Sequence, residues 1–322
     1  MSATPSSPAD GAGRDAATTT GAGRATDRKG QELPPQPRMA FGRWFAELGI
    51  RHVIGIVFVI YAAFPIVYVI SASLAGQGAT LTGSNSLFTS FDVGSYSQLS
   101  DTTLYWTWFR NTMFIGLSTA IGTVVMAAAA AYAFSRFRFK GHAFGLNTLL
   151  VLQMFPQLLA FVAIFLLLLS IGEVVPSLGL NSRIGLICVY LGGALGTNTF
   201  LMYGFFNTVP KELDEAAKID GASHARIYWT IILRMVAPVL AVVGLLSFVS
   251  TFSDFVIARV VLQSEQNWTL ALGLYQMVSS LTNQNWGMFA AGAVIAAVPV
   301  LLLFLFLQRY IVGGLTAGSV KG

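Results

Sequence analysis

The charged stretch EAAKIDGA, residues 215–222, lies between two apolar runs at 184–206 and 235–257. Each run has the roughly 20 residues that an α-helix needs to cross a hydrocarbon core about 30 Å thick. Plain polar loops usually join membrane spans, whereas this stretch is compatible with a helix carrying small and charged side chains. Such a helix indicates a docking surface for a soluble partner. The stretch predicts a membrane protein that does no chemistry itself and receives mechanical work from a neighbour.

The composition of the whole chain supports a membrane protein. Its 322 residues are 55% hydrophobic and 10% charged, whereas soluble domains have about 25% charged residues. Asp254 is the exception in apolar blocks that are otherwise almost free of ionisable groups. The blocks are 53–74, 111–134, 143–170, 184–206, 235–257 and 288–307. We predict an all-α polytopic membrane protein with six transmembrane helices.

Prolines fall inside four of these predicted spans: Pro65, Pro156, Pro238 and Pro299. Each proline removes a backbone hydrogen bond and tends to kink its helix, which neighbouring helices can compensate. Kinks of this kind suit a protein that changes shape, although static bundles contain them too.

The distribution of basic residues predicts the orientation. All 19 Lys and Arg residues except Arg110, Arg183 and Arg259 lie in segments that alternate to one side of the six spans. Because basic residues favour the cytoplasmic side, both termini should be cytoplasmic in a multi-pass protein of the bacterial inner membrane. The net charge of +5 then reflects topology, and a nucleic-acid partner has little support. The first apolar run begins too late for a cleaved signal peptide, so we expect it to remain as a signal anchor.

Four regions follow from these patterns. Residues 1–38 are poor in large apolar side chains and should form a disordered cytoplasmic tail. Residues 39–52 mix aromatic and charged side chains, which favours an amphipathic interfacial segment, with an ordinary cytoplasmic lead-in as the alternative. A membrane domain should span residues 53–312, and residues 313–322 should form a cytoplasmic C-terminal tail.

Two long polar loops are expected on the outer side, at 75–110 and 258–287. The first ends in an aromatic cluster, for which structural anchoring at the membrane interface is favoured over ligand stacking. This cluster comprises Tyr105, Trp106, Trp108 and Phe109.

Few residues could perform chemistry. Cys188 is the only cysteine, which excludes an internal disulfide and a cysteine-based metal cluster. The three His residues are scattered, and no metal site is expected. An intramembrane carboxylate is a functional candidate by default. For Asp254, near the outer end of its span, we favour an ion pair with Arg259 or a water-facing position over a transport role.

The segment 211–226 has the periodicity of a small-faced helix. At about 100° per residue, one narrow face holds Leu213, Ala217, Gly221 and His224. Another quarter holds Glu215, Ile219, Ala222 and Arg226. Small residues let a partner backbone approach closely, and Glu215 can pair with a partner Arg. A helix lying passively on the membrane surface has the same periodicity, so this alternative stays open here.

The start of this helix carries its own signals. Pro210 suits the first turn of a helix, and the acidic residues Glu212, Asp214 and Glu215 complement the positive end of the helix dipole.

The literal residues resemble the EAA loop of ABC-importer permeases. The match consists of Glu215-Ala216-Ala217, three residues, Gly221, nine residues, and then Ile231 and Leu233. In that family the loop forms a coupling helix that sits in a cleft of a cytoplasmic ATPase subunit. The family pattern continues with Pro after the Leu, where this chain has Arg234 and places Pro238 four residues later. The departure concerns the bend that follows the coupling helix.

The resemblance extends over most of residues 50–322. Three segments look like the MalG-type subunit of maltose/maltodextrin importers: WTLALG at 268–273, WGMFAAG at 286–292 and the tail GGLTAGSVKG at 313–322. The runs QMFP at 153–156 and YLGG at 190–193 fit the same subunit. The resemblance implies the type I ABC-importer permease fold, also called MetI-like, and residues 1–40 match nothing in the family.

The resemblance also implies residue roles. The ATPase-coupling residues would be Glu215, Ala216, Ala217, Asp220, Gly221 and Arg226. A tail near the ATPase dimer interface would comprise Gly318, Ser319, Val320, Lys321 and Gly322. A loop entering the cleft of the sugar-binding protein would comprise Gln263, Ser264, Glu265, Gln266 and Asn267. The membrane sugar site would belong mainly to the partner permease.

The implied partners are a second, MalF-like permease, a MalK-like ATPase dimer, an extracytoplasmic sugar-binding protein, the lipid bilayer and a sugar. The chain lacks the G-x-x-x-x-G-K-[ST] motif, so ATP and Mg²⁺ should be used by the ATPase and no cofactor is expected on this chain. The alternative substrates are another oligosaccharide, a disaccharide or a polyol.

Two other classes are weighed against this interpretation. A secondary transporter would use intramembrane charges, of which the chain has almost none, and it would commonly show an inverted repeat. An ion channel would need a polar ring around its pore, for which six apolar spans offer little.

Overall fold

A computed structural model describes residues 49–76, 87–88, 90–154, 157–279 and 284–317, with side chains described as far as Tyr310. In these ranges the chain is helical and contains no strand. It divides into two units, residues 1–63 and 64–322. The predicted tail 1–38 and most of the interfacial segment 39–52 lie outside the described residues.

The first unit is described from residue 49 onward and contributes the first part of helix α2 (Ile50–Ser73). Its apolar side chains, such as Val57 and Val59, are exposed around the helix. A helix that is apolar on every side suits a lipid environment.

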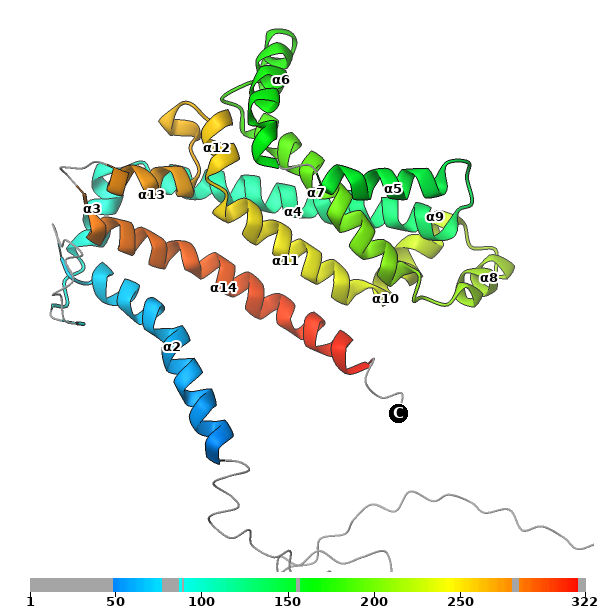
Figure 1. Ribbon diagram of the computed structural model, residues 1–322, viewed down its shortest axis with the longest axis horizontal. Coiled ribbons are helices and arrows are strands. Elements are labelled where there is room, and N and C mark those ends of the chain that lie inside the picture. Colours follow the sequence, from blue (N-terminus) through cyan, green and yellow to red (C-terminus); the bar gives the residue numbers. More distant parts are fainter. Residues whose placement is uncertain (1–48, 77–86, 89, 155–156, 280–283, 318–322) are drawn as a thin grey trace, which may run out of the picture. The chain divides into compact units, whose positions relative to one another are not determined.

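The second unit contains the remaining helices (Figure 1). The α-helices are α3 (Gly94–Thr102), α4 (Tyr105–Arg136), α5 (His142–Gln153), α6 (Phe161–Val174), α7 (Arg183–Phe206), α8 (Lys211–Ile219), α9 (His224–Ile227), α10 (Leu233–Met235), α11 (Ala237–Ser253), α12 (Val256–Val261), α13 (Leu270–Ser279) and α14 (Trp286–Ala317). Short 3₁₀ turns are η2 (Gln157–Ala160), η3 (Pro176–Leu178) and η5 (Glu265–Asn267), and η4 (Tyr228–Ile232) is a π-helix.

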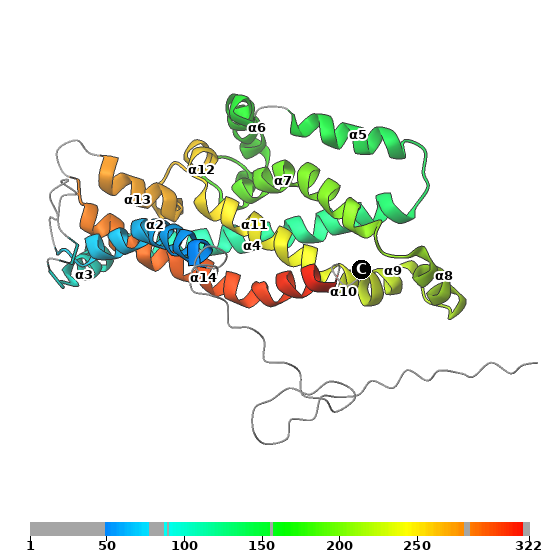
Figure 2. The same ribbon diagram turned by 60° about the horizontal axis from the view of Figure 1, so that its bottom comes forward.

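Helix α4 is the centre of this unit. It packs along α7 and α11, and α11 packs in turn on α14 (Figures 1 and 2). Three buried apolar clusters follow its length. The first, around Ala128 and Phe206, joins α4 to the ends of α7 and η4. The second, around Ile115, joins it to α6, α7 and α12. The third, around Tyr105, joins it to α3, α13 and α14.

Four described helices are long and apolar enough to cross a membrane: α2, α4, α7 and α14. Residues 224–235 and α11 form a pair of helical segments with a bend of 79° at the break between them. If this pair is one broken span, it is the fifth. Pro238 lies in the first turn of α11, where its missing N–H costs little. It therefore marks a helix start after a sharp bend and does not lie within a continuous span.

The apolar block 143–170 differs from the single span that its length suggests. It contains two shorter helices, α5 and α6, with η2 between them. Pro156 of this block lies outside the described residues. The hydropathy of the block predicts that its environment is apolar. It does not predict whether the chain keeps one direction through the block.

The predicted outer loops also contain helices. The segment 75–110 includes α3 and the first turn of α4, and 258–287 includes most of α12 and all of α13. Within the aromatic cluster, Tyr105 and Trp108 are buried in the third apolar cluster, while Trp106 is exposed. Burial of two of the rings supports the structural interpretation of this cluster.

Two glycines of the segments that resemble the MalG type permit close packing. A Cβ at Gly273 would lie 2.0 Å from the ring of Trp108, and one at Gly292 would lie 2.4 Å from Leu274. The Tyr105 hydroxyl donates a hydrogen bond to the Gly292 carbonyl at 2.9 Å. These glycines therefore let α13 and α14 approach α4 closely.

Gly273→Ala is expected to lower the free energy of unfolding by about 1–3 kcal/mol, the usual cost of overpacking. Trp108 cannot simply move away, because its indole N–H donates to the Glu265 carbonyl at 2.9 Å. The measurement is the thermal unfolding midpoint in detergent. Gly192→Ala is the matched control, since a Cβ there meets nothing within 4 Å. Equal midpoints for the two variants would contradict this packing.

Candidate functional site

The segment between α7 and α11 begins with a capped helix. Pro210 is the N-cap residue of α8, and Glu212 and Asp214 lie in its first turn, as the sequence predicted. Lys218 lies in the last turn. Both charge placements complement the helix dipole, so α8 is stabilised by its own sequence.

The helix ends in a Schellman motif at the Asp-Gly pair. The Ala222 N–H donates to the Ala217 carbonyl at 2.9 Å, and the Gly221 N–H donates to the Lys218 carbonyl at 3.0 Å. Gly221 has φ +79°, the left-handed conformation that this cap requires. Ser223 then caps α9 by accepting from the Arg226 N–H at 3.3 Å.

The expectation of one helix over 211–226 is therefore wrong. Helix α8 ends at Ile219, and the chain turns at 220–223 before α9 begins. The predicted face of Leu213, Ala217, Gly221 and His224 does not exist, because Gly221 belongs to the turn. The segment consists of two short helices joined by a turn, and we call it the 211–226 knob.

The chain that directly follows the knob is part of the protein core, and the knob packs against this core. Ile227, Tyr228 and Ile232 are buried in the first apolar cluster against Ala128 of α4 and Phe206 of α7. Ala217 and Ala222 also pack against this cluster. Ala217, predicted to meet a partner, is thus half-buried and lets α8 lie close to its own core.

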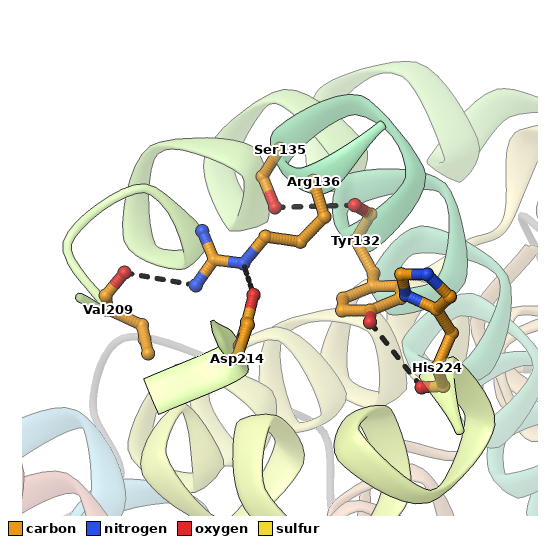
Figure 3. A network of polar contacts seen from close by, with 6 residues as sticks. All are labelled: Tyr132, Ser135, Arg136, Val209, Asp214 and His224. Atoms are coloured by element: carbon orange, nitrogen blue, oxygen red, sulfur yellow. Dashed lines mark hydrogen bonds and ion pairs between the residues drawn. The ribbon is translucent and has the colours of Figure 1, made fainter. Parts of the chain in front are cut away.

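A buried ion pair fixes α8 to the end of α4 (Figure 3). The Arg136 Nε lies 2.6 Å from the Asp214 carboxylate, and both side chains are almost fully buried. A second guanidinium nitrogen of Arg136 donates to the Val209 carbonyl at 2.9 Å. Arg136 therefore holds both the entry to the knob and its first helix.

The second half of the knob is attached to the same end of α4. The Tyr132 hydroxyl donates to the His224 carbonyl at 3.4 Å (Figure 3). The Tyr132 and Tyr228 rings lie 5.0 Å apart, and the Phe137 and His224 rings meet edge to face at 5.1 Å. Because both halves contact α4, a displacement of the knob must move the end of that helix.

The outer surface of the knob is available to a partner. The predicted coupling residues Glu215, Ala216, Asp220, Gly221 and Arg226 are exposed. Ile219 beside them is 87% exposed. Ile219 is the last residue of α8 and lies between the charged residues Lys218 and Asp220, a combination that suits a contact surface.

The predicted binding-protein loop, residues 263–267, is fastened to the body of the unit. The Asn181 side-chain oxygen accepts from the Gln263 N–H at 3.1 Å and from the Ser264 N–H at 2.9 Å. The Asn111 amide donates to the Gln266 carbonyl at 2.8 Å. The Gln263, Glu265 and Gln266 side chains remain exposed, so the loop presents them from a fixed backbone.

Asp254 occupies a different environment from the predicted ion pair. Its Oδ1 accepts from the Tyr190 hydroxyl at 2.7 Å and from the Ala258 N–H at 3.0 Å. Arg259 instead lies over the Trp268 ring, with 5.7 Å to the ring centroid. The ion-pair alternative is therefore wrong, and Asp254 lines a cavity beside α7.

The C-terminal tail differs in extent from the prediction. Helix α14 continues to Ala317, beyond the expected boundary at residue 312. The tail residues Gly318, Ser319, Val320, Lys321 and Gly322 lie outside the described residues.

Sequence reasoning missed the residues that hold the knob. Asp214 was assigned only to the helix dipole, and Arg136 only to the basic cytoplasmic side. A signal did exist for the turn, because Asp-Gly following a last-turn Lys is typical of a helix C-terminus. No local pattern predicted the Arg136–Asp214 pair, whose members are far apart in the sequence.

Comparison with known proteins assigns the chain to a family. Residues 123–316 match the model of the family described as "Binding-protein-dependent transport system inner membrane component". The maltodextrin permease MdxG of Bacillus subtilis is 41% identical over 72% of this chain and 82% of its own length. The permease MalG of the Escherichia coli K12 maltose/maltodextrin system is 37% identical over 86% and 97%. The galactooligosaccharide permease GanQ of Bacillus subtilis is 37% identical over 86% and 99%.

A solved structure has the same fold. It is a bacterial ABC transporter involved in the import of the acidic polysaccharide alginate, and the aligned chain is 24% identical with a TM-score of 0.70. The alignment covers 85% of this chain and 99% of that one. The predicted permease fold is confirmed, and the chain belongs to the family of inner-membrane components of binding-protein-dependent transport systems.

Proposed function

We propose that this chain is one of two permease subunits of an ATP-driven importer of maltose/maltodextrin type. The observation that carries the proposal is the 211–226 knob, exposed on its outer surface and joined to α4 on its inner one. The similarity to MdxG and MalG supports a maltodextrin as the substrate. A galactooligosaccharide is the second candidate, supported by the similarity to GanQ.

The knob would lie in the cytoplasm, in a cleft of an ATPase subunit. Glu215 offers a carboxylate to a basic side chain there, and Ile219 offers an apolar contact. Asp220, Gly221 and Arg226 lie on the same outer surface. Both termini would be cytoplasmic, in keeping with the basic residues of the N-terminal segment.

The mechanism requires two arrangements of the membrane helices. When ATP and Mg²⁺ bind and close the ATPase dimer, the clefts move and take the knob with them. Arg136 and Tyr132 transmit the displacement to α4, and η4 and α10 transmit it to α11 across the 79° bend. Because packed helices shift between discrete arrangements, a small movement of the knob can change access to the pathway.

The partners on the outer side would be a sugar-binding protein and a second permease. Residues 263–267 would contact the binding protein, since Gln263, Glu265 and Gln266 project from a backbone fixed by Asn181. A fixed loop loses little conformational entropy on contact, which favours its use as a recognition element.

Uptake by a reconstituted importer tests the proposal. The importer would contain this chain, the partner permease, the ATPase and the binding protein in proteoliposomes. Maltodextrin uptake should require ATP inside the proteoliposomes and survive an uncoupler of the proton gradient. Uptake of galactooligosaccharide without maltodextrin would favour the second candidate. Uptake that persists without ATP and collapses with the uncoupler would instead identify a secondary transporter.

A further inference from the structure

A cavity of about 350 Å³, lined by both polar and apolar side chains, lies beside α4, α7 and α11. Its polar lining includes Thr119, Tyr190, Asn198, Ser250, Thr251 and Asp254. Ligand pockets in proteins have volumes of roughly 300–1,000 Å³, so the cavity has room for a small ligand or for one end of a longer one.

The polar lining follows the helical repeat on two helices. On α11 the residues Ser247, Ser250 and Thr251 lie on one face, and they line the cavity together with the C-cap residue Asp254. On α7 the lining residues Tyr190 and Asn198 lie two turns apart on one face. Polar side chains within the membrane-spanning part of a protein are candidates for a function, and these two stripes line one cavity.

Several polar atoms at this cavity have no partner in the described part of the chain. The Thr119 hydroxyl lacks a hydrogen bond although Thr119 is only 1% exposed. Asp254 uses Oδ1 for Tyr190 and Ala258, which leaves Oδ2 as an acceptor. Asn198 donates through its side-chain nitrogen to the Ala194 carbonyl at 2.8 Å, so its side-chain oxygen is available. The Thr119 hydroxyl oxygen is enclosed by protein, whereas the free oxygens of Asp254 and Asn198 can accept hydrogen bonds from a ligand in the cavity.

The charge at the cavity restricts the ligand. Among the described residues that line it, Asp254 carries the one carboxyl group, and none is Lys or Arg. An acidic ligand would meet this carboxylate without a compensating cation. A ligand rich in hydroxyl groups would donate to Asp254 and Asn198 and exchange hydrogen bonds with Ser250.

We propose that this cavity is a binding subsite for a neutral sugar unit within the transport pathway. The proposal rests on the proposed function and deepens it. The resemblance of the sequence implies that the membrane sugar site belongs mainly to the partner permease, and the proposal adds a subsite on this chain. When this chain has its own subsite, the substrate contacts both permeases. An oligosaccharide can then be held at two points. The subsite selects neutral saccharides over those that carry carboxylate groups.

Binding to the importer without its binding protein tests the proposal. Radiolabelled maltotriose is the probe, and the complex contains this chain, the partner permease and the ATPase. Asp254→Asn and Ser250→Leu should each weaken binding by about tenfold or more, the loss expected for a hydrogen bond to a charged group or for a filled subsite. Asparagine keeps an oxygen for Tyr190 and Ala258, so the local structure should persist.

Asp101→Asn is the matched control, because it makes the same chemical change on exposed α3, outside the cavity. It should bind maltotriose like the unmodified complex. ATP hydrolysis stimulated by the binding protein reports an intact assembly in every variant. Trigalacturonate, which carries carboxylates, should fail to compete with maltotriose, and Asp254→Asn should relax this exclusion.

The outcomes separate the two proposals. If the unmodified importer takes up and binds maltodextrin and both cavity variants bind it equally well, the subsite is refuted while the proposed function stands. Competition by trigalacturonate as strong as that by unlabelled maltotriose would also refute it. If the unmodified importer shows ATP-driven uptake of neither maltodextrin nor galactooligosaccharide, the proposed function is refuted, and the neutral-sugar subsite with it.

Discussion

Arg136→Met is expected to lower the free energy of unfolding by about 3–5 kcal/mol, because it leaves the buried Asp214 carboxylate without its partner. Asp214 is only 6% exposed, so water cannot readily replace the guanidinium. The substitution also removes the hydrogen bond to the Val209 carbonyl. The thermal unfolding midpoint in detergent measures the loss, and sugar uptake should be lost with it.

Two further variants make this result interpretable. Arg138→Met changes an exposed arginine two residues further along the chain and should alter neither the midpoint nor uptake. The double variant Arg136→Met/Asp214→Leu replaces the pair by apolar side chains and should recover most of the stability, since no buried charge is left unpaired. Uptake should stay below normal in the double variant, because the bond to Val209 remains absent. A midpoint for Arg136→Met equal to that of the unmodified protein would contradict the role of the pair.

Gly221→Pro is expected to abolish sugar uptake while the protein still inserts into the membrane. Proline fixes φ near about −65° and has no N–H, whereas Gly221 has φ +79° and donates to the Lys218 carbonyl. The end of α8 must therefore rearrange, and the outer surface of the knob loses its shape. ATP hydrolysis by the assembled importer should no longer respond to the binding protein.

Gly141→Pro is the matched control for this variant. Gly141 also has a positive φ, +90°, and a Cβ at either glycine meets nothing within 4 Å. Gly141 lies in the connection between α4 and α5, so its substitution should strain the backbone without deforming the knob. Gly221→Ala should have an intermediate effect, because the backbone strain of a positive φ costs about 1–2 kcal/mol. Normal uptake by Gly221→Pro would count against coupling through the knob.

The sequence was sufficient to predict the membrane class, the family and the start of α8. Those features depend on local composition or on short motifs, such as Pro210 followed by two acidic residues. The end of α8 was missed, because Gly221 was treated as a small residue on a helix face. Its left-handed conformation is what the structure uses, and the Asp-Gly pair was the available signal.

The arrangement of the spans was only partly predictable. Hydropathy measures how apolar a stretch is and cannot show whether α5 and α6 continue in one direction. It also cannot show that Pro238 follows a bend of 79°. Helix α13 was predicted as part of a loop because its apolar face is short. This face packs against Trp108, which is distant in sequence.

The cavity could not be predicted as a site from single residues. Asn198 and Asp254 stood out as polar residues at membrane depth, whereas Ser247, Ser250 and Thr251 are too weakly polar to interrupt an apolar run. Their spacing on α11 was visible in the sequence. That α7 presents Tyr190 to the same space depends on the packing of two helices.

Site-directed cross-linking tests the central claim, which is that an ATPase subunit contacts the outer surface of the knob. Cys188→Ser removes the single cysteine of the chain, and Ala216→Cys then introduces one thiol on α8. We expect a short bifunctional reagent to join this thiol to the ATPase subunit in the assembled importer, while the added change Asp101→Cys on α3 gives no such product. Free reaction of the Ala216→Cys thiol with a water-soluble maleimide in the complete importer, without any cross-link to the ATPase, would contradict the account.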